Sequence, residues 1–571
     1  MQNFVKYLNT LHRFNGNNDN ATAEANYLNK YASDILVPDL KLVETIEIAL
    51  KSFHKVLLTG FAGDGKTTIA RIIAKRNLQE PRTIIQQENS SRPLVIIKDL
   101  SEISDDDSFL YNDLINPNID LLIVSNTGTF RKKISDLYDR FCLKYNSLGN
   151  KLNFETLVLS GMENVDNNAQ GIIRISPELE IKVFNLVKHD NIDLAMKVFK
   201  KILDHPSWNN ANESEKKSIP YINRELMRNN NYLALIRMEM IYRRIYEYGN
   251  RMTIRQLIEH FSYSLTGNYY SYHKFSFSNF NDLFFMNFFN PKAAHIGITG
   301  VQLVNDAKLG FNIDSNWKRR IWIGADSDVL KIIFGIEWFE NLFNFEKNQS
   351  SAKRSDYLRR ISVLRAIFFL NSAFDESNYS WAFIDSFLNS PGYRYFYQIN
   401  REKGLLSRAD KNFISKKIRH VVKEYFIGMK IPETSSYASK KEVYIAMSRN
   451  LANLKQTTQV ILKSFEWKDL IIERDGRGIY QLVLVTDIPN VSMQINLPFL
   501  DYLLSCHSGF ITDPAFSNYR KRLDNLRNNI LKSCNPEDNS FMQLAYMDLS
   551  REIHIINCYN EHNKIYVEEG E

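Results

Sequence analysis

The amino-acid sequence predicts an α/β fold in its first half and a mostly helical α+β region after it. A strand, a glycine-rich loop and a helix follow one another between residues 55 and 76, two further apolar runs each end in a polar side chain, and helical periodicity dominates after residue 160. The chain has 571 residues, which exceeds the size at which a single hydrophobic core stops growing. We therefore expect several domains.

The glycine-rich loop carries the most specific chemistry. It fits the pattern G-x-x-x-x-G-K-[ST] with Gly60, Phe61, Ala62, Gly63, Asp64, Gly65, Lys66, Thr67 and Thr68. Glycines let backbone N–H groups wrap a phosphate, while Lys66 adds a positive charge and Thr67 a hydroxyl for Mg²⁺. The motif predicts a P-loop NTPase core that binds ATP and Mg²⁺. A plain glycine turn is the alternative, and the flanking strand and helix argue against it.

The segment 92–99 is predicted to be an apolar strand that ends in Asp99, the position at which such a core keeps an acid that organises Mg²⁺. Glu102 follows three residues later and could polarise an attacking water, although the acidic residues Asp105, Asp106 and Asp107 make a solvated turn the alternative. The interval between Lys66 and Asp99 is short, so a strand at 83–86 must fit there with little or no helix after it. If no strand forms at 83–86, the acid that organises Mg²⁺ has to be assigned to a residue other than Asp99.

The run 119–125 ends in Asn126. An amide at the tip of the strand beside the acid-bearing strand resembles the sensor-1 residue of AAA+ ATPases, which orients water against the γ-phosphate. The alternative is an asparagine that begins a turn. Further along the chain, Thr253 is a candidate N-cap for an amphipathic helix over 254–265, which resembles an AAA+ lid helix. Arg255 could act there as a sensor-2 arginine, or simply lie on the surface.

No arginine finger can be chosen among Arg131, Arg140 and Arg174. The cysteines lack metal-ligand or paired spacing, which predicts free thiols in a reducing compartment; they are Cys142, Cys506, Cys534 and Cys558. The N-terminus lacks a basic segment followed by an apolar one, and no apolar run reaches the roughly 20 residues that span a bilayer. We expect a cytoplasmic protein that does not enter a membrane.

Polar breaks divide the sequence into five expected segments. These are an N-terminal helical segment at 1–45, the P-loop core at 46–160, a helical lid region at 161–270, a helical region at 271–432 and an α+β segment at 433–571. The histidines of the second half are isolated in the sequence and are interpreted as packed or surface residues: His295, His420, His507 and His554.

Residues 391–423 interleave cations with aromatic residues. Such a segment can follow a nucleic-acid backbone and stack bases, or it can be a helix with a buried aromatic cluster and a solvated basic face. Shorter basic runs occur at 318–320 and 359–360. The formal charge of +7 is mild for this length and identifies no nucleic-acid binder by itself.

Taken together, the loop 60–68, the run Ile97-Lys98-Asp99-Leu100-Ser101-Glu102, the run 125–128 and the helix-forming segment 253–267 resemble one family. This is the ATPase subunit, called DptF or DndF, of bacterial restriction systems linked to DNA phosphorothioate modification. The resemblance covers the first half of the chain better than the second. It implies an ATPase that works with sibling restriction subunits, and on DNA directly or through them, in antiphage defence against DNA that lacks the modification.

Two other functions remain open from the sequence. The chain could be a signalling or scaffold NTPase that binds nucleotide as a switch and hydrolyses little of it. It could also be a DNA-remodelling motor whose turnover rises with DNA. Assembly into an oligomer is compatible with each of these functions.

Overall fold

The computed structural model describes most of the chain, and the account below concerns the residues it describes: 1–12, 30–35, 40–76, 78, 80–86, 92–103, 108–145, 150–163, 170–267, 282–290, 297–309, 364–370, 378–447, 458–474, 480–509, 517–533, 541–548, 550–561 and 564–569. These residues form two compact units. The first unit comprises Met1–Asn389 with Gly476–Gly478, and the second comprises Ser390–Asp475 with Ile479–Glu571.

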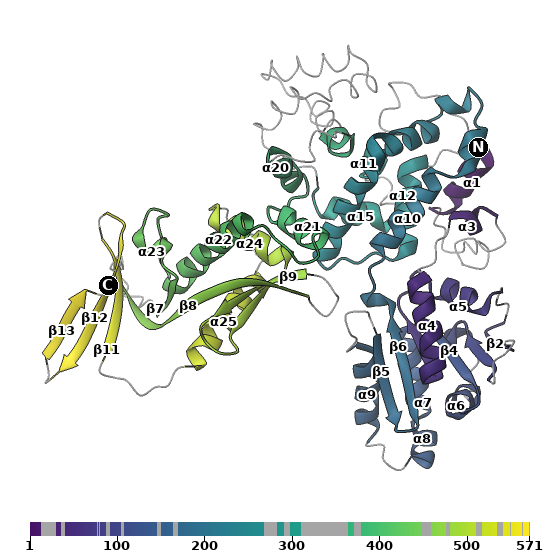
Figure 1. Ribbon diagram of the computed structural model, residues 1–571, viewed down its shortest axis with the longest axis horizontal. Coiled ribbons are helices and arrows are strands. Elements are labelled where there is room, and N and C mark those ends of the chain that lie inside the picture. The colour runs from purple at the N-terminus through teal and green to yellow at the C-terminus, as the bar shows by residue number, and fades with distance from the viewer. Residues whose placement is uncertain are drawn as a thin grey trace. The chain divides into compact units, whose positions relative to one another are not determined.

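The first unit contains a six-stranded sheet with the order β2-β3-β4-β1-β6-β5 (Figure 1). The strands are β1 (Lys55–Thr59), β2 (Arg82–Ile85), β3 (Leu94–Ile97), β4 (Asp120–Ser125), β5 (Gln170–Ser176) and β6 (Leu179–Asn185). Strands β3, β4, β1 and β6 run parallel, while β2 and β5 pair antiparallel at the two edges. The carboxyl ends of four strands therefore meet at one edge of the sheet.

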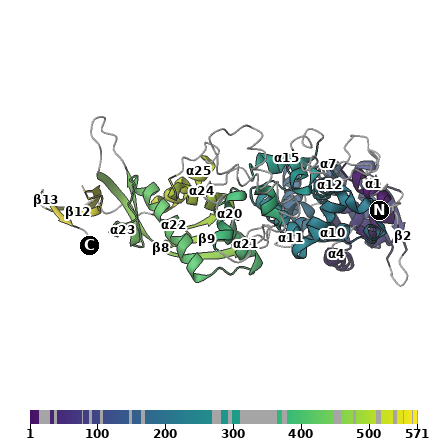
Figure 2. The same ribbon diagram turned by 90° about the horizontal axis from the view of Figure 1, so that it is seen from above.

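Helices cover both faces of this sheet. Successive side chains of a strand point to opposite faces, so β1 contributes to the hydrophobic core on each side. Val56 and Leu58 pack with α4 (Leu40–Phe53) and α5 (Lys66–Ala74). Leu57 packs in the opposite core, to which four helices contribute: α6 (Ser108–Ile115), α7 (Thr127–Asp136), α8 (Tyr138–Lys144) and α9 (Lys151–Glu163). Figure 2 shows α4 and α7 on opposite sides of this part of the chain. The result is a sheet between two helical layers.

A helical part completes the first unit. It includes α1 (Gln2–Thr10), α3 (Lys30–Ile35), α10 (Ile192–Leu203), α11 (Ile219–Glu247), α12 (Ile254–Thr266), α13 (Phe284–Asn287), α15 (Thr299–Asp306) and α20 (Asn378–Phe387). Phe199 of α10 stacks on Phe261 of α12 with ring centroids 4.0 Å apart, and Phe4 of α1 stacks on His205 at 4.1 Å. Asn229–Tyr232 interrupt α11 with non-helical backbone angles. Aromatic packing thus joins the N-terminal helix to the helices that follow the sheet.

The second unit is built on an antiparallel sheet with the order β10-β9-β8-β11-β12-β13, and β7 pairs with β8. Its strands are β7 (Glu442–Met447), β8 (Thr458–Arg474), β9 (Tyr480–Thr486), β10 (Ser492–Ile495), β11 (Phe541–Met547), β12 (Ile553–Glu561) and β13 (Lys564–Glu569). Its helices are α21 (Tyr393–Arg401), α22 (Arg408–Ile427), α23 (Ser436–Ser439), α24 (Leu497–His507) and α25 (Ser517–Lys532). The long strand β8 pairs with β7 and β11 through its first half and with β9 through its second.

The mixed α/β class agrees with the sequence-based expectation, whereas two limits of the expected segments fall elsewhere. The sheet continues past residue 160, because β5 and β6 belong to it, so the region expected to be a helical lid begins with two strands. The expected limit at 432/433 lies inside the second unit, where α22 packs against β7 and β8. None of the helices in the described ranges is long and apolar enough to cross a membrane.

Candidate functional site

The glycine-rich loop lies at the sheet edge where four parallel strands end. Thr59 at the end of β1 is level with Ser125 of β4 on one side and with Asn185 of β6 on the other. Gly63 and Gly65 take φ angles of +90° and +82°, which side chains with a Cβ atom rarely adopt. Helix α5 then begins at Lys66, so the N–H groups of its first turn face the loop. Glycine conformation and helix start together form a cradle suited to an anion.

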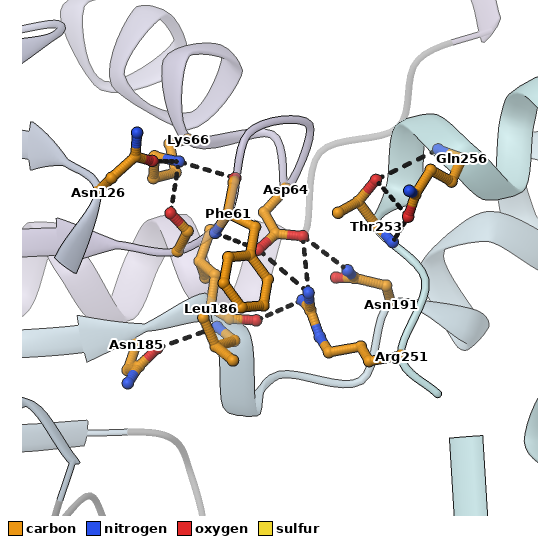
Figure 3. A network of polar contacts seen from close by, with 12 residues as sticks. Phe61, Asp64, Lys66, Asn126, Asn185, Leu186, Asn191, Arg251, Thr253 and Gln256 are labelled. Carbon is orange, nitrogen blue, oxygen red and sulfur yellow. Dashed lines mark hydrogen bonds and ion pairs between the residues drawn. The ribbon is translucent and has the colours of Figure 1, made fainter. Parts of the chain in front are cut away.

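Lys66 points back into this loop. Its Nζ donates hydrogen bonds to the carbonyl oxygens of Gly60 at 2.9 Å and Phe61 at 2.8 Å, and to Asn126 Oδ1 at 3.2 Å (Figure 3). Burial lowers the pKa of Lys66, Asp64 and Asp99 act to raise that pKa, and two nearby arginines act to lower it. The charges of both carboxylates therefore act on the lysine that the sequence predicts for phosphate binding.

The sheet order brings the predicted strand-end residues together. Strand β4 lies between β1 and β3, and all three run parallel, so Asn126 and Asp99 follow strands that end at the loop's edge of the sheet. Asp99 Oδ1 accepts hydrogen bonds from the N–H of Ser101 at 2.9 Å and from its Oγ at 2.6 Å, which caps the short helix Leu100–Glu102. Asn126 is the residue before α7, and its side chain is the one that contacts Lys66.

Glu102 is oriented differently. Its side chain is 47% exposed and forms an ion pair with Lys98 at 3.5 Å. The structure thus pairs the exposed Glu102 carboxylate with the buried side chain of Lys98. Asp105, Asp106 and Asp107, on which the alternative interpretation of this stretch depended, lie outside the described residues.

The first turn of α12 contacts the loop directly. The backbone N–H of Arg255 donates to the carbonyl of Gly63 at 3.2 Å, and a Cβ atom on Gly63 would lie 3.0 Å from the Cβ of Arg255 and 3.1 Å from Thr253 Oγ1. Thr253 caps the helix as expected, in a reciprocal box with Gln256 (Figure 3). The exposed Arg255 side chain is near enough that its charge acts on the pKa of Lys66. The sequence predicted the position of this helix correctly. The fold brings its first turn into contact with the loop.

Two side chains of this network, Arg251 and Asn191, were not predicted from the sequence, and Asp64 was predicted only as a member of the nucleotide-binding loop, without this ion pair. Asp64 occupies a variable position of the loop motif, yet its carboxylate is fully buried and binds Arg251 and Asn191. Arg251 lies just before the N-cap of α12, and Asn191 just before α10. The only sequence signal for this contact was Asp64 itself, an acidic residue at a motif position where any residue type is allowed.

The arginines considered as fingers have intramolecular partners. Arg131 pairs with Glu155 at 3.1 Å and Arg174 with Glu180 at 2.8 Å. The guanidinium of Arg140 lies 6.0 Å from the centre of the Tyr111 ring. These contacts do not single out one of them for a neighbouring subunit.

Comparisons with models of protein families, with curated proteins and with solved structures found no match to this chain. The functional argument therefore depends on the geometry of the loop and its neighbours. Among the residues that the structure describes, no group of three or more His, Cys, Asp or Glu side chains could hold a metal ion.

The residues of the loop fit a nucleotide with Mg²⁺ in the chemistry of their donors. Thr67, half-buried in the first turn of α5, offers a hydroxyl, and Asp99 offers a carboxylate at the same sheet edge, both of which are hard oxygen ligands. Such a site leaves most Mg²⁺ positions to phosphate oxygens and water, so a three-carboxylate cluster is not required.

The basic and aromatic segment 391–423 forms α21 and most of α22. Tyr393, Tyr395 and Phe396 are buried, so these rings pack in the second unit and do not offer their faces to bases. Exposed cations remain along both helices and in the connection between them: Arg401, Lys403, Arg408 and Lys416. The short basic runs at 318–320 and 359–360 lie outside the described residues.

Two of the histidines interpreted as isolated are neighbours in space. The rings of His420 and His507 have centroids 5.2 Å apart, and each ring contacts a glutamate. His554 contacts Asp548 at 3.1 Å. His295 and Cys534 lie outside the described residues, while Cys142, Cys506 and Cys558 are free thiols, as expected.

Proposed function

We propose that this chain binds ATP with Mg²⁺ at the loop 60–68 and hydrolyses it. The observation that carries the proposal is the position of Lys66 Nζ, held between two loop carbonyls and the amide of Asn126. A charged amine, a helix start and a polar side chain from the adjacent strand converge there. This is the combination that phosphoryl transfer needs, because its catalysis consists mainly of positioning and charge stabilisation.

Each residue has a role in this proposal. Lys66 exchanges its loop carbonyls for phosphate oxygens, and Asn126 orients the attacking water. Thr67 and Asp99 hold Mg²⁺, which supplies charge neutralisation to the phosphates. Arg255 reaches the phosphates from α12, whose first turn already contacts the loop. P-loop and lid architecture of the AAA+ kind is part of the same proposal, supported by the insertion of β4 between β1 and β3.

The cellular role we propose follows the family that the sequence resembles. ATP turnover by this chain would serve a bacterial restriction complex with sibling subunits, directed at DNA that lacks phosphorothioate modification. The exposed cations of α21 and α22 support direct contact with DNA phosphates.

A switch with little turnover is the second candidate, and one observation favours it. Glu102, the expected polarising base, is exposed and paired with Lys98. A base held away from the phosphates leaves nucleotide binding intact but slows hydrolysis. A partner that displaces Lys98 from Glu102 would then control turnover.

ATP affinity and turnover of the purified chain, with and without duplex DNA, test the proposal. Lys66→Ala is expected to abolish detectable ATP binding, and Asp99→Ala to reduce Mg²⁺-dependent turnover by at least about tenfold while leaving weak binding. Lys197→Ala, an exposed lysine of α10, serves as the control and should match the parent. ATP binding that survives in Lys66→Ala would remove the basis of the proposal. Tight binding with negligible turnover in every condition would favour the switch.

A further inference from the structure

We infer that Arg251 is a positioning residue for the phosphate-binding loop, because it neutralises a carboxylate, Asp64, that the loop carries within itself. The inference rests on the proposed function, since its main consequence is for ATP affinity. It assigns a role to the ion pair between Asp64 of the loop and Arg251, a residue that was not expected to contribute to nucleotide binding.

The Asp64 carboxylate is enclosed by the loop and by the segments around it. Its side chain is 0% exposed. Oδ2 accepts the backbone N–H of Phe61 at 2.8 Å, and Oδ1 accepts from Asn191 Nδ2 at 3.2 Å. Arg251 Nη1 donates to the two oxygens at 3.0 and 3.2 Å (Figure 3). The carboxylate therefore fixes the turn of the loop from inside and forms its ion pair with Arg251.

Arg251 is held in place from a second side. Its Nη2 donates to the carbonyl oxygen of Leu186 at 2.6 Å, in the turn that follows β6, and its side chain is only 12% exposed. Its guanidinium carbon lies 5.9 Å from the centre of the Phe61 ring. One guanidinium thus connects the loop, the end of β6 and the start of α12.

The charges explain why this arginine is needed. A buried carboxylate is costly unless it is paired, and here it also lies next to a site that we propose for a triphosphate. Two cations face Asp64 from the elements around it: Lys66 in its own loop, which the proposal assigns to phosphate, and Arg251. Once Lys66 engages phosphate, Arg251 is the cation left to balance Asp64. Without it, the buried negative charge of Asp64 has no ion-pair partner and lies beside an anionic ligand.

This role makes a double-mutant cycle informative. We expect Arg251→Met to weaken ATP binding about tenfold or more, equivalent to about 1.4 kcal/mol. Asp64→Asn removes the charge and keeps an oxygen that can accept the Phe61 N–H, so it should bind ATP at least as tightly as the parent. The double variant should recover to within about threefold of the parent, because Arg251 is then no longer needed for charge balance. ADP, with less negative charge, should show a smaller loss in Arg251→Met than ATP.

The measurement is calorimetric titration of ATP and of ADP, each with Mg²⁺, into the full chain. Arg243→Met is the matched control, since Arg243 also pairs with carboxylates in the helical part, but its partners Asp190, Asp193 and Glu239 are 38%, 68% and 31% exposed. That change leaves no buried charge, so ATP affinity should stay at the parent value. Circular dichroism melts of every variant separate a change in binding from a loss of fold.

The outcomes are distinct. If the parent chain binds neither nucleotide, the proposed function fails and the cycle does not arise. Two results would overturn the inference and leave the proposed function standing. In the first, Arg251→Met binds ATP with the same affinity as the parent. In the second, the double variant binds ATP as weakly as Arg251→Met. Should Arg251→Met not fold, Asp64→Asn and the double variant decide: equal ATP affinity supports charge balance, and a weaker double variant refutes it.

Discussion

At the scale of single residues, burial of charged groups near the loop gives measurable consequences. Glu259 is 1% exposed on α12, and neither carboxylate oxygen has a hydrogen-bond partner within the described part of the chain. Burial raises the pKa of Glu259 to about 8, and the charge of Arg255 offsets this only in part. The side chain is therefore protonated in the folded protein at neutral pH.

Glu259→Gln tests this protonation. The folded pKa of about 8 exceeds the ordinary value of 4.5, so between these pH values the folded protein holds a proton that the unfolded chain has lost. Stability conferred by the parent side chain falls as pH rises through this window. We expect the amide variant to match the parent near pH 5 and to melt a few degrees higher near pH 8, by differential scanning calorimetry. The exposed Glu44→Gln is the control, and equal melting temperatures at pH 8 would contradict the prediction.

At the scale of elements, the contact between the loop and the first turn of α12 depends on a glycine. Gly63→Ala would force a Cβ atom into a φ of +90° and within 3.0 Å of the Cβ of Arg255. A left-handed conformation costs a residue with a Cβ atom about 1–2 kcal/mol, and the clash adds to this. We expect Gly63→Ala to melt at a lower temperature than the parent and to bind ATP about tenfold more weakly.

Gly128→Ala provides the matched comparison for that change. Gly128 lies in α7 at the same sheet edge, and a Cβ atom there would meet nothing within 4 Å. Replacement of a helical glycine by alanine stabilises by roughly 0.5–1 kcal/mol. The two variants should therefore shift the melting temperature in opposite directions, and a loss of similar size in both would refute the role of the close contact.

Elements were predictable from the sequence where the local pattern was strong. The strand expected before the loop coincides with β1, and the runs before Asp99 and Asn126 contain β3 and β4. A short strand was expected at 83–86, and β2 occupies Arg82–Ile85. The pattern of 254–265 matches α12, including its cap. Each of these depends on contacts between residues near in sequence or on a long apolar run.

The missed features depend on distant pairing. Strands β5 and β6 were assigned to a helical region, because their short alternating runs stand among helical patterns and β6 joins the sheet only through β1. The pairing of His420 with His507 and of Asp64 with Arg251 links residues far apart in the sequence. Such contacts are not encoded in any local window, so a single sequence does not reveal them.

At the scale of the whole molecule, the buried aromatics of α21 define what DNA contact the second unit can make. The rings of Tyr393, Tyr395 and Phe396 are packed inside, whereas the cations are exposed. The ring of Phe413 on α22 is 45% exposed, and Lys417 Nζ lies 4.4 Å from its centre. Phosphate contact without base stacking is independent of sequence and strongly dependent on salt.

Neutralising these cations tests the DNA contact. We expect Arg401→Gln, Lys403→Gln, Arg408→Gln and Lys416→Gln together to weaken duplex binding, measured by fluorescence anisotropy, and to reduce the slope of log affinity against log salt by up to about 3.6. ATP turnover without DNA should not change. Lys197→Gln with Lys201→Gln, exposed on α10 of the first unit, is the control. An unchanged salt slope in the fourfold variant would place any DNA contact elsewhere.

The long strand β8 has a consequence for how the second unit folds. Residues 460–466 pair with β7 and residues 467–474 with β9, so one continuous strand belongs to both halves of the sheet. Neither half can lose β8 without exposing the strand edge of the other, which ties them into one cooperative transition. Because β8 also pairs with β11, about 80 residues later in the chain, closure of a long loop must precede much of the stabilising contact. Slow refolding of this unit, as a single step, is the expected kinetic signature.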